Sequence, residues 1–142
     1  MKPDSLRRLV REDAWQRYSQ RLTDPAVVDV LHALFESIVE HLAGRIDDIR
    51  DVDGKAISFF SQEREILTIN ITRKNLRIYV HPSSLAYFDP DLEYRVEKLS
   101  FWESSYNKES GRYRGLSVWI SNKKYLRDIE KIIRNIPQST VE

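Results

Sequence analysis

The 142-residue chain contains no cysteine, which excludes disulfide bonds, thiolate nucleophiles and cysteine-ligated zinc or iron–sulfur centres. It has only four glycines, and the phosphate-binding patterns GxGxxG and GxxxxGK[ST] and the nucleophile pattern GxSxG do not occur. No apolar run approaches the roughly 20 residues that span a bilayer, and the first residues, MKPDSLRRLVRED, carry charges where a signal peptide is apolar. We therefore expect a cytoplasmic protein with no cofactor and no membrane partner.

What the chain does contain is enough apolar sequence for one core. Hydrophobic residues make up 41% and charged residues 32%, which predicts a single globular domain over residues 1–142. The charge is unevenly distributed, with six basic against three acidic residues in 1–22, two against eight in 23–53, and fifteen against eleven in 54–142. This pattern predicts a basic N-terminal helix over 1–22, an α+β core over 23–142, and steering of an anionic partner to one side.

Helical spacing of apolar residues recurs in three segments. The first is 4–22, with arginines between its apolar positions. The second begins at Asp24 and Pro25, a capping residue followed by a residue suited to the first helical position, and ends at Gly44. The third is 122–136, which Asn122 can cap and Pro137 stops.

Alternation of apolar and polar residues predicts an antiparallel sheet between these helices. The expected strands are 56–61, 65–72, 75–80 and 116–121. A short helix is expected over 91–99, an acidic bend over 47–55 and a polar loop over 103–115. The order is α-α-β-β-β-α-β-α, an α+β fold in which helices pack on one face of a four-stranded antiparallel sheet.

Several strings within 25–136 resemble a family of small uncharacterised bacterial domains that are sometimes labelled predicted transport proteins. The strings are GKAISFF, KNLRIYVHP, FDPDLEYRVEKLSFW and GRYRGLSVWISNKKYLRDIEKIIRNI. Members of that family occur alone or appended to restriction-type nucleases. The resemblance implies the same fold and an accessory or binding role, with a nuclease as one candidate partner.

The strand NLRIYV is the most informative segment for function. Alternation sends Leu76, Ile78 and Val80 to the core, and it sends polar and aromatic residues to the other side. Exposed aromatic rings on a sheet can stack nucleic-acid bases while basic side chains hold phosphates. We therefore predict a non-catalytic nucleic-acid-binding surface. Its predicted residues are Arg73, Lys74, Arg77, Tyr79, Arg112, Arg114 and Trp119.

Other uses of this surface stay open. Residues 83–113 can cover it, or two copies of the chain can pair through it as a homodimer. The main alternative is a small metal-free ribonuclease centred on His81, Tyr79 and Arg77, which would need a second acid or base held against His81.

The other histidines and the N-terminal arginines are further candidates for a binding site. His32 and His41 lack a second histidine at metal-ligand spacing, so no metal site is predicted. The arginines of the first helix can grip a phosphate backbone or an acidic partner, or they can form a solvated surface.

Overall fold

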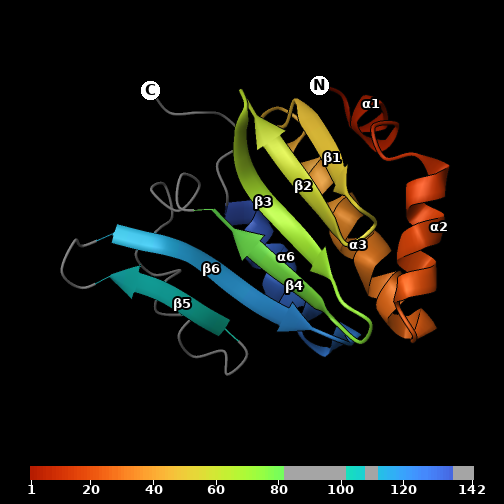
Figure 1. The fold of residues 1–142 in the computed structure, drawn as a ribbon. Helices are drawn as coiled ribbons and strands as arrows, with labels where there is room; N and C mark the ends of the chain where they lie inside the picture. The colour runs from red at the N-terminus through yellow and green to blue at the C-terminus, as the bar shows by residue number, and fades with distance from the viewer. Residues whose placement is uncertain (82–101, 108–111, 136–142) are drawn as a thin grey trace.

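The computed structural model describes residues 1–81, 102–107 and 112–135, and it shows an α+β fold with a six-stranded antiparallel sheet (Figure 1). Across the sheet the strand order is β1-β2-β3-β4-β6-β5. The strands are β1 Asp48–Val52, β2 Ala56–Ser61, β3 Arg64–Ile71, β4 Leu76–Val80, β5 Trp102–Asn107 and β6 Arg112–Ile120. The helices are α1 Pro3–Arg7, α2 Glu12–Arg21, α3 Pro25–Leu42 and α6 Leu126–Asn135, with a 3-10 turn at Lys123–Tyr125.

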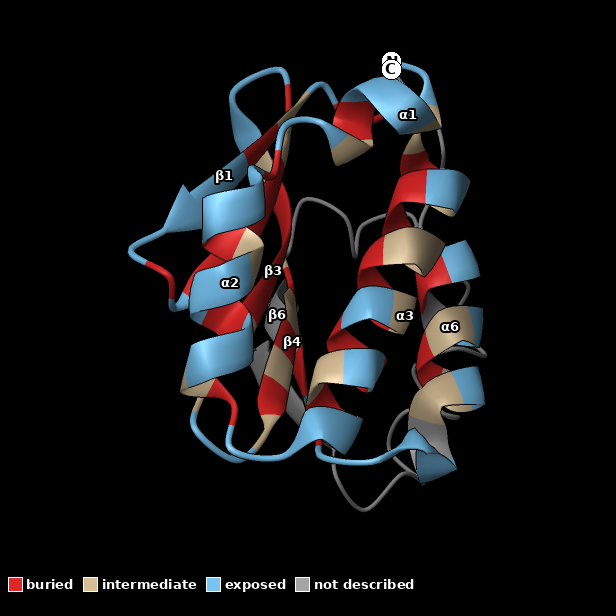
Figure 2. Ribbon diagram, turned by 90° about the vertical axis from the view of Figure 1, so that its right-hand side faces the viewer, coloured by how far each residue is buried: buried red, intermediate tan, exposed pale blue. Residues whose placement is uncertain are grey.

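The helices α3 and α6 lie on one side of the sheet, as Figures 1 and 2 show from two directions. The α3 helix begins where the sequence predicts, because a carboxylate oxygen of Asp24 accepts from the backbone N–H of Ala26 at 2.9 Å. Asn122 caps the last helical segment in the same way, accepting from the N–H of Lys124. None of the described helices combines the length and the apolar character needed to cross a membrane.

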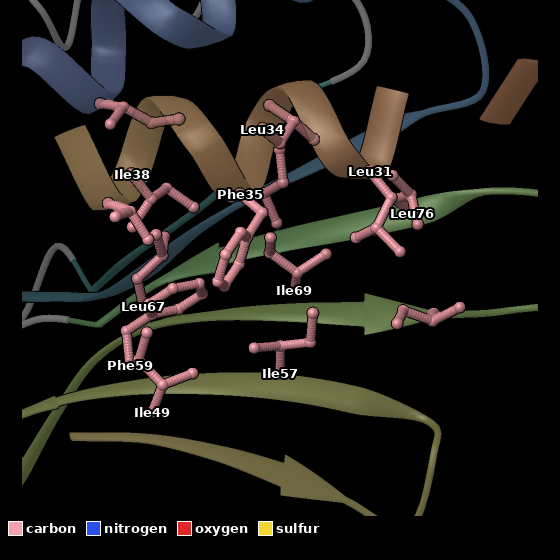
Figure 3. Close-up of a cluster of buried hydrophobic side chains, with 14 of the residues drawn as sticks. Leu31, Leu34, Phe35, Ile38, Ile49, Ile57, Phe59, Leu67, Ile69 and Leu76 are labelled. Carbon is pink, nitrogen blue, oxygen red and sulfur yellow. The ribbon is translucent and has the colours of Figure 1, made fainter. Parts of the chain in front are cut away.

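One apolar cluster fills the space between α3 and the sheet (Figure 3). It forms because the apolar positions of α3 recur on one side of the helix while those of the strands alternate toward it. The residues labelled in Figure 3 are Leu31, Leu34, Phe35 and Ile38 of α3, and Ile49, Ile57, Phe59, Leu67, Ile69 and Leu76 of the strands, all buried.

The prediction of four strands is wrong, because the described sheet also includes β1 and β5. The acidic string DDIRDVDGK predicts a bend where β1 forms, and Ile49 is the one buried residue of this strand. Its remaining helix-side residue, Asp51, is acidic but receives hydrogen bonds from the Tyr18 hydroxyl at 2.5 Å and from Arg17 at 2.7 Å, both in α2. The β5 segment was predicted as polar loop, and it forms a strand by pairing with β6, which starts at Arg112 rather than at residue 116.

The single N-terminal helix predicted over 4–22 is also wrong, because the chain forms two helices with a break between Arg7 and Glu12. Leu6 at the end of α1 and Val10 within the break are both buried, so packing against the core fixes the bend. The short helix predicted over 91–99 lies outside the described residues.

Two arginines of the basic N-terminus pair with the acidic segment that follows it. Arg7 contacts the carboxylates of Glu36 and Glu40 in α3, with nitrogen–oxygen distances of 2.8 Å and 3.5 Å, and Arg17 pairs with Asp51. Part of the charge asymmetry in the sequence is therefore matched within the chain.

The first two hairpins turn through left-handed backbone. Asp53 and Gly54 have positive φ between β1 and β2, where an Asp-Gly pair is typical of such a turn. Gln62 and Glu63 adopt the same region between β2 and β3, although neither residue type favours it. The predicted hairpin between β3 and β4 is confirmed, with Ile71 opposite Leu76.

Candidate nucleic-acid interface

The face of the sheet opposite α3, here called the open face, carries polar and aromatic side chains from neighbouring strands. The register places Ser58, Thr68, Tyr79 and Ser117 in one row across β2, β3, β4 and β6. An adjacent row runs through Asn70, Arg77 and Trp119. The sequence correctly assigned the residues of β3, β4 and β6 in these rows to this face, because alternation in paired strands fixes the side of each residue.

Arg77, Tyr79 and Trp119 form a cluster, here called the arginine–aromatic cluster. The guanidinium carbon of Arg77 lies 5.6 Å from the centre of the Trp119 ring and 5.8 Å from that of Tyr79, within the range of cation–π attraction. Arg77 Nη2 donates to the hydroxyl of Ser117 at 2.8 Å. Trp119 remains 37% exposed, so the cluster is accessible at its Trp119 side.

The Arg77 side chain retains unused hydrogen-bonding capacity. Its Nε is buried and has no hydrogen-bond partner, and no carboxylate among the described residues forms an ion pair with it. Among the described residues, this guanidinium contacts two aromatic rings and a neutral hydroxyl, a setting in which its charge can attract an anion.

His81 lies beside this cluster and has an acidic neighbour that alternation alone does not reveal. Its ring meets the edge of Tyr79 with centroids 4.7 Å apart, and its Nε2 lies 3.3 Å from a carboxylate oxygen of Glu65. Glu65 has the sequence parity of the core residue Leu67 and would point to the helix side in a regular strand.

A β-bulge in β3 moves Glu65 to the open face. Phe59 pairs with Leu67 but the next residue, Phe60, pairs with Glu65, so Ile66 is the extra residue of the bulge. The two consecutive apolar residues Ile66 and Leu67, which interrupt the alternation of β3, are the signal in the sequence that could have identified it. The backbone N–H of His81 donates to the carbonyl of Ile66 at 2.9 Å, which aligns His81 with the bulge.

The charges on the open face divide it into two parts. On β1, Arg50 is shared between Asp48 of the same strand at 2.7 Å and Glu63 in the turn between β2 and β3 at 3.5 Å, and it also lies 4.1 Å above the ring of Phe60 in β2. Its charge is therefore already paired. Arg77 on β4 has no ion-pair partner in the described part of the chain, so an anion is expected to bind over β4 and β6 rather than over the whole sheet.

Other predicted residues are distributed around this area. Arg73 and Lys74 are exposed in the turn between β3 and β4, at the end of β4 where Arg77 pairs with Trp119. The backbone of Arg112 and Arg114 lies in β6, and their side chains fall outside the part of the chain that is described. The segment 83–113, predicted as a candidate cover, falls mostly outside it as well.

The remaining histidines lie in the helical layer. The ring of His32 stacks on Trp15 at 4.5 Å, along a groove of about 540 Å³ between α2 and α3. The ion pair of Arg7 with Glu36 occupies part of the groove wall. Within the described residues, no group of three histidines or carboxylates is arranged to hold a metal ion.

Comparisons of the chain with protein-family models, with curated proteins and with solved structures find no match.

Proposed function

We propose that this protein is a binding module for single-stranded nucleic acid, acting through the arginine–aromatic cluster as an accessory to nucleic-acid processing. The observation that carries the proposal is Arg77, which is held between two aromatic rings without a described carboxylate partner. In a structural role, a half-buried arginine is normally neutralised by an acidic neighbour.

The two kinds of group in the cluster match the two parts of a nucleotide. Trp119 offers an exposed ring on which a base can stack, and stacking works with every base. Arg77 offers guanidinium N–H groups to a phosphate, and Arg73 and Lys74 extend the positive charge along the turn. The surface is therefore suited to flexible single strands, whose bases are free to turn toward the protein.

The test is fluorescence anisotropy with labelled 12-nucleotide RNA, DNA and duplex DNA at low and moderate salt. We expect single strands to bind more tightly than the duplex, with affinity that falls steeply as salt increases. Arg77→Ala and Trp119→Ala should each weaken binding about tenfold or more, since stacking of one base contributes roughly 1–3 kcal/mol.

The matched control is Arg127→Ala, which removes an exposed arginine from α6 on the helical side. It should leave the affinity unchanged. Equal affinities of the Arg77→Ala and Arg127→Ala variants, or no binding at low salt, would rule the proposal out. A homodimer that shields Trp119 from a fluorescence quencher would then favour pairing of two copies through the open face.

A further inference from the structure

The carboxylate of Glu65 is the centre of a polar cluster on the open face. One of its oxygens lies 3.3 Å from Nε2 of His81 and accepts from the hydroxyl of Ser58 at 3.2 Å. The same oxygen accepts from the hydroxyl of Thr68, and the two hydroxyls are 3.3 Å apart. Contacts with His81, Ser58 and Thr68 therefore fix the position of this carboxylate.

The imidazole of His81 is held just as firmly. Its backbone is tied to Ile66 in the bulge, its ring meets the edge of Tyr79, and its Nε2 faces Glu65. A carboxylate beside Nε2 favours the tautomer in which that nitrogen carries the hydrogen, so that Nδ1 carries the lone pair and can take a proton. Side-chain exposure is 28% for His81 and 31% for Glu65, so the pair is accessible from solvent.

The pair adjoins the proposed binding surface on the same strand. Tyr79 separates His81 from Arg77, and all three alternate to the open face of β4. Arg77 and His81 are four residues apart, about 13 Å along the extended chain, so a nucleotide strand that places a phosphate at Arg77 would run past Tyr79 and bring a sugar further along the strand toward His81. Catalysis at His81 requires a second acid or base held against its ring, and Glu65 occupies that position in the structure.

On the basis of the proposed function, we propose that His81 is a catalytic base that cleaves single-stranded RNA without a metal, and that Glu65 is its positioning residue. His81 removes the proton of a 2′-hydroxyl, and the 2′-oxygen forms a bond to the adjacent phosphorus as the bond to the 5′-oxygen breaks. The imidazolium returns the proton to that 5′-oxygen. The products are a 2′,3′-cyclic phosphate and a 5′-hydroxyl, with no other reactant consumed.

The substrate test uses a 5′-labelled 12-nucleotide RNA with EDTA present, together with the same RNA carrying one 2′-deoxynucleotide and the all-DNA strand. We expect cleavage of the RNA to a cyclic phosphate end, loss of cleavage at the deoxy position, and no cleavage of DNA. Cleavage at the deoxy position, or RNA that binds without being cleaved, would overturn the proposal while leaving the binding function intact. Absence of binding would instead overturn both.

The protein test compares His81→Ala with His32→Ala, the same substitution in α3 on the helical side. Loss of a general base should slow cleavage by about 100-fold or more, with RNA affinity unchanged. The His32→Ala variant should cleave at the normal rate. Equal rates in the two variants would overturn the assignment of His81 as the catalytic base. His81→Gln, which keeps more of the side chain, serves if the alanine variant does not fold.

Glu65→Gln tests the positioning role against a purely structural one. Glu63→Gln is its control, since Glu63 lies two residues away with 89% of its side chain exposed. Glu65→Gln should lower kcat with KM unchanged and alter the pH–rate profile, whereas Glu63→Gln should alter neither. A Glu65→Gln variant that loses thermal stability but cleaves with the normal kcat and pH profile would show that Glu65 serves only Ser58 and Thr68.

Discussion

Ile57, Ile69, Ile78 and Val118 form one row across four strands on the helix side, and their sequence neighbours Ser58, Thr68, Tyr79 and Ser117 form the next row on the open face. The first row is almost completely buried, and so are the three small polar residues of the second. The helix-side row is held by apolar contacts, whereas the open-face row depends on hydrogen bonds. Burial alone therefore does not distinguish the helix side, which stabilises the fold, from the open face, which carries the candidate binding and catalytic residues.

The largest expected effect comes from truncating the helix-side row. Ile69→Ala removes a fully buried side chain from beneath α3 and leaves a cavity that the rigid sheet cannot close. We expect the free energy of unfolding to fall by about 3 kcal/mol, measured by urea denaturation. A loss below about 1 kcal/mol would mean that the helix side is not the main source of stability.

An intermediate effect on stability is expected at the hydrogen bond between Tyr18 of α2 and Asp51 of β1. Tyr18→Phe removes the hydroxyl that donates to the Asp51 carboxylate, so we expect a loss of about 1.5 kcal/mol at neutral pH, measured by urea denaturation.

The same contact makes a prediction about pH. Burial, followed by the hydrogen bond to Asp51, raises the pKa of Tyr18 above its ordinary value of 10.0. Above pH 10 the unfolded chain loses this proton while the folded chain keeps it, so the stability of the wild type falls. The stability difference between wild type and Tyr18→Phe should therefore narrow above pH 10. A constant difference would contradict the raised pKa.

The smallest effect is expected for Thr68→Val, next to Ile69 but on the open face. The change keeps the shape of the side chain and removes the hydroxyl that contacts Ser58 and Glu65. We expect a loss of about 1 kcal/mol, measured under the same conditions as for Ile69→Ala. A loss as large as that of Ile69→Ala would show that the hydrogen bonds of the open face stabilise the fold as much as the apolar core.

Much of the fold could be predicted because its signals are local and strong. Alternation located β2, β3 and β4, and helical spacing with a capping Asp24 located α3. Alternation failed for β1, because Asp51 takes a helix-side position that only α2 makes favourable. It failed for β5 because a polar strand at the sheet edge is defined by its partner rather than by its own residues.

The residues of the candidate site also fall into two groups, those that alternation assigns to a face and those that only strand pairing brings together. Arg77, Tyr79 and His81 are assigned to one face by sequence alone, since side chains alternate along a strand. The position of Trp119 opposite Arg77, and of Glu65 beside His81 through the bulge at Ile66, follows from the folded sheet and not from alternation. The physical reason is that strand pairing and bulges depend on residues far apart in the chain, whereas alternation depends only on neighbours.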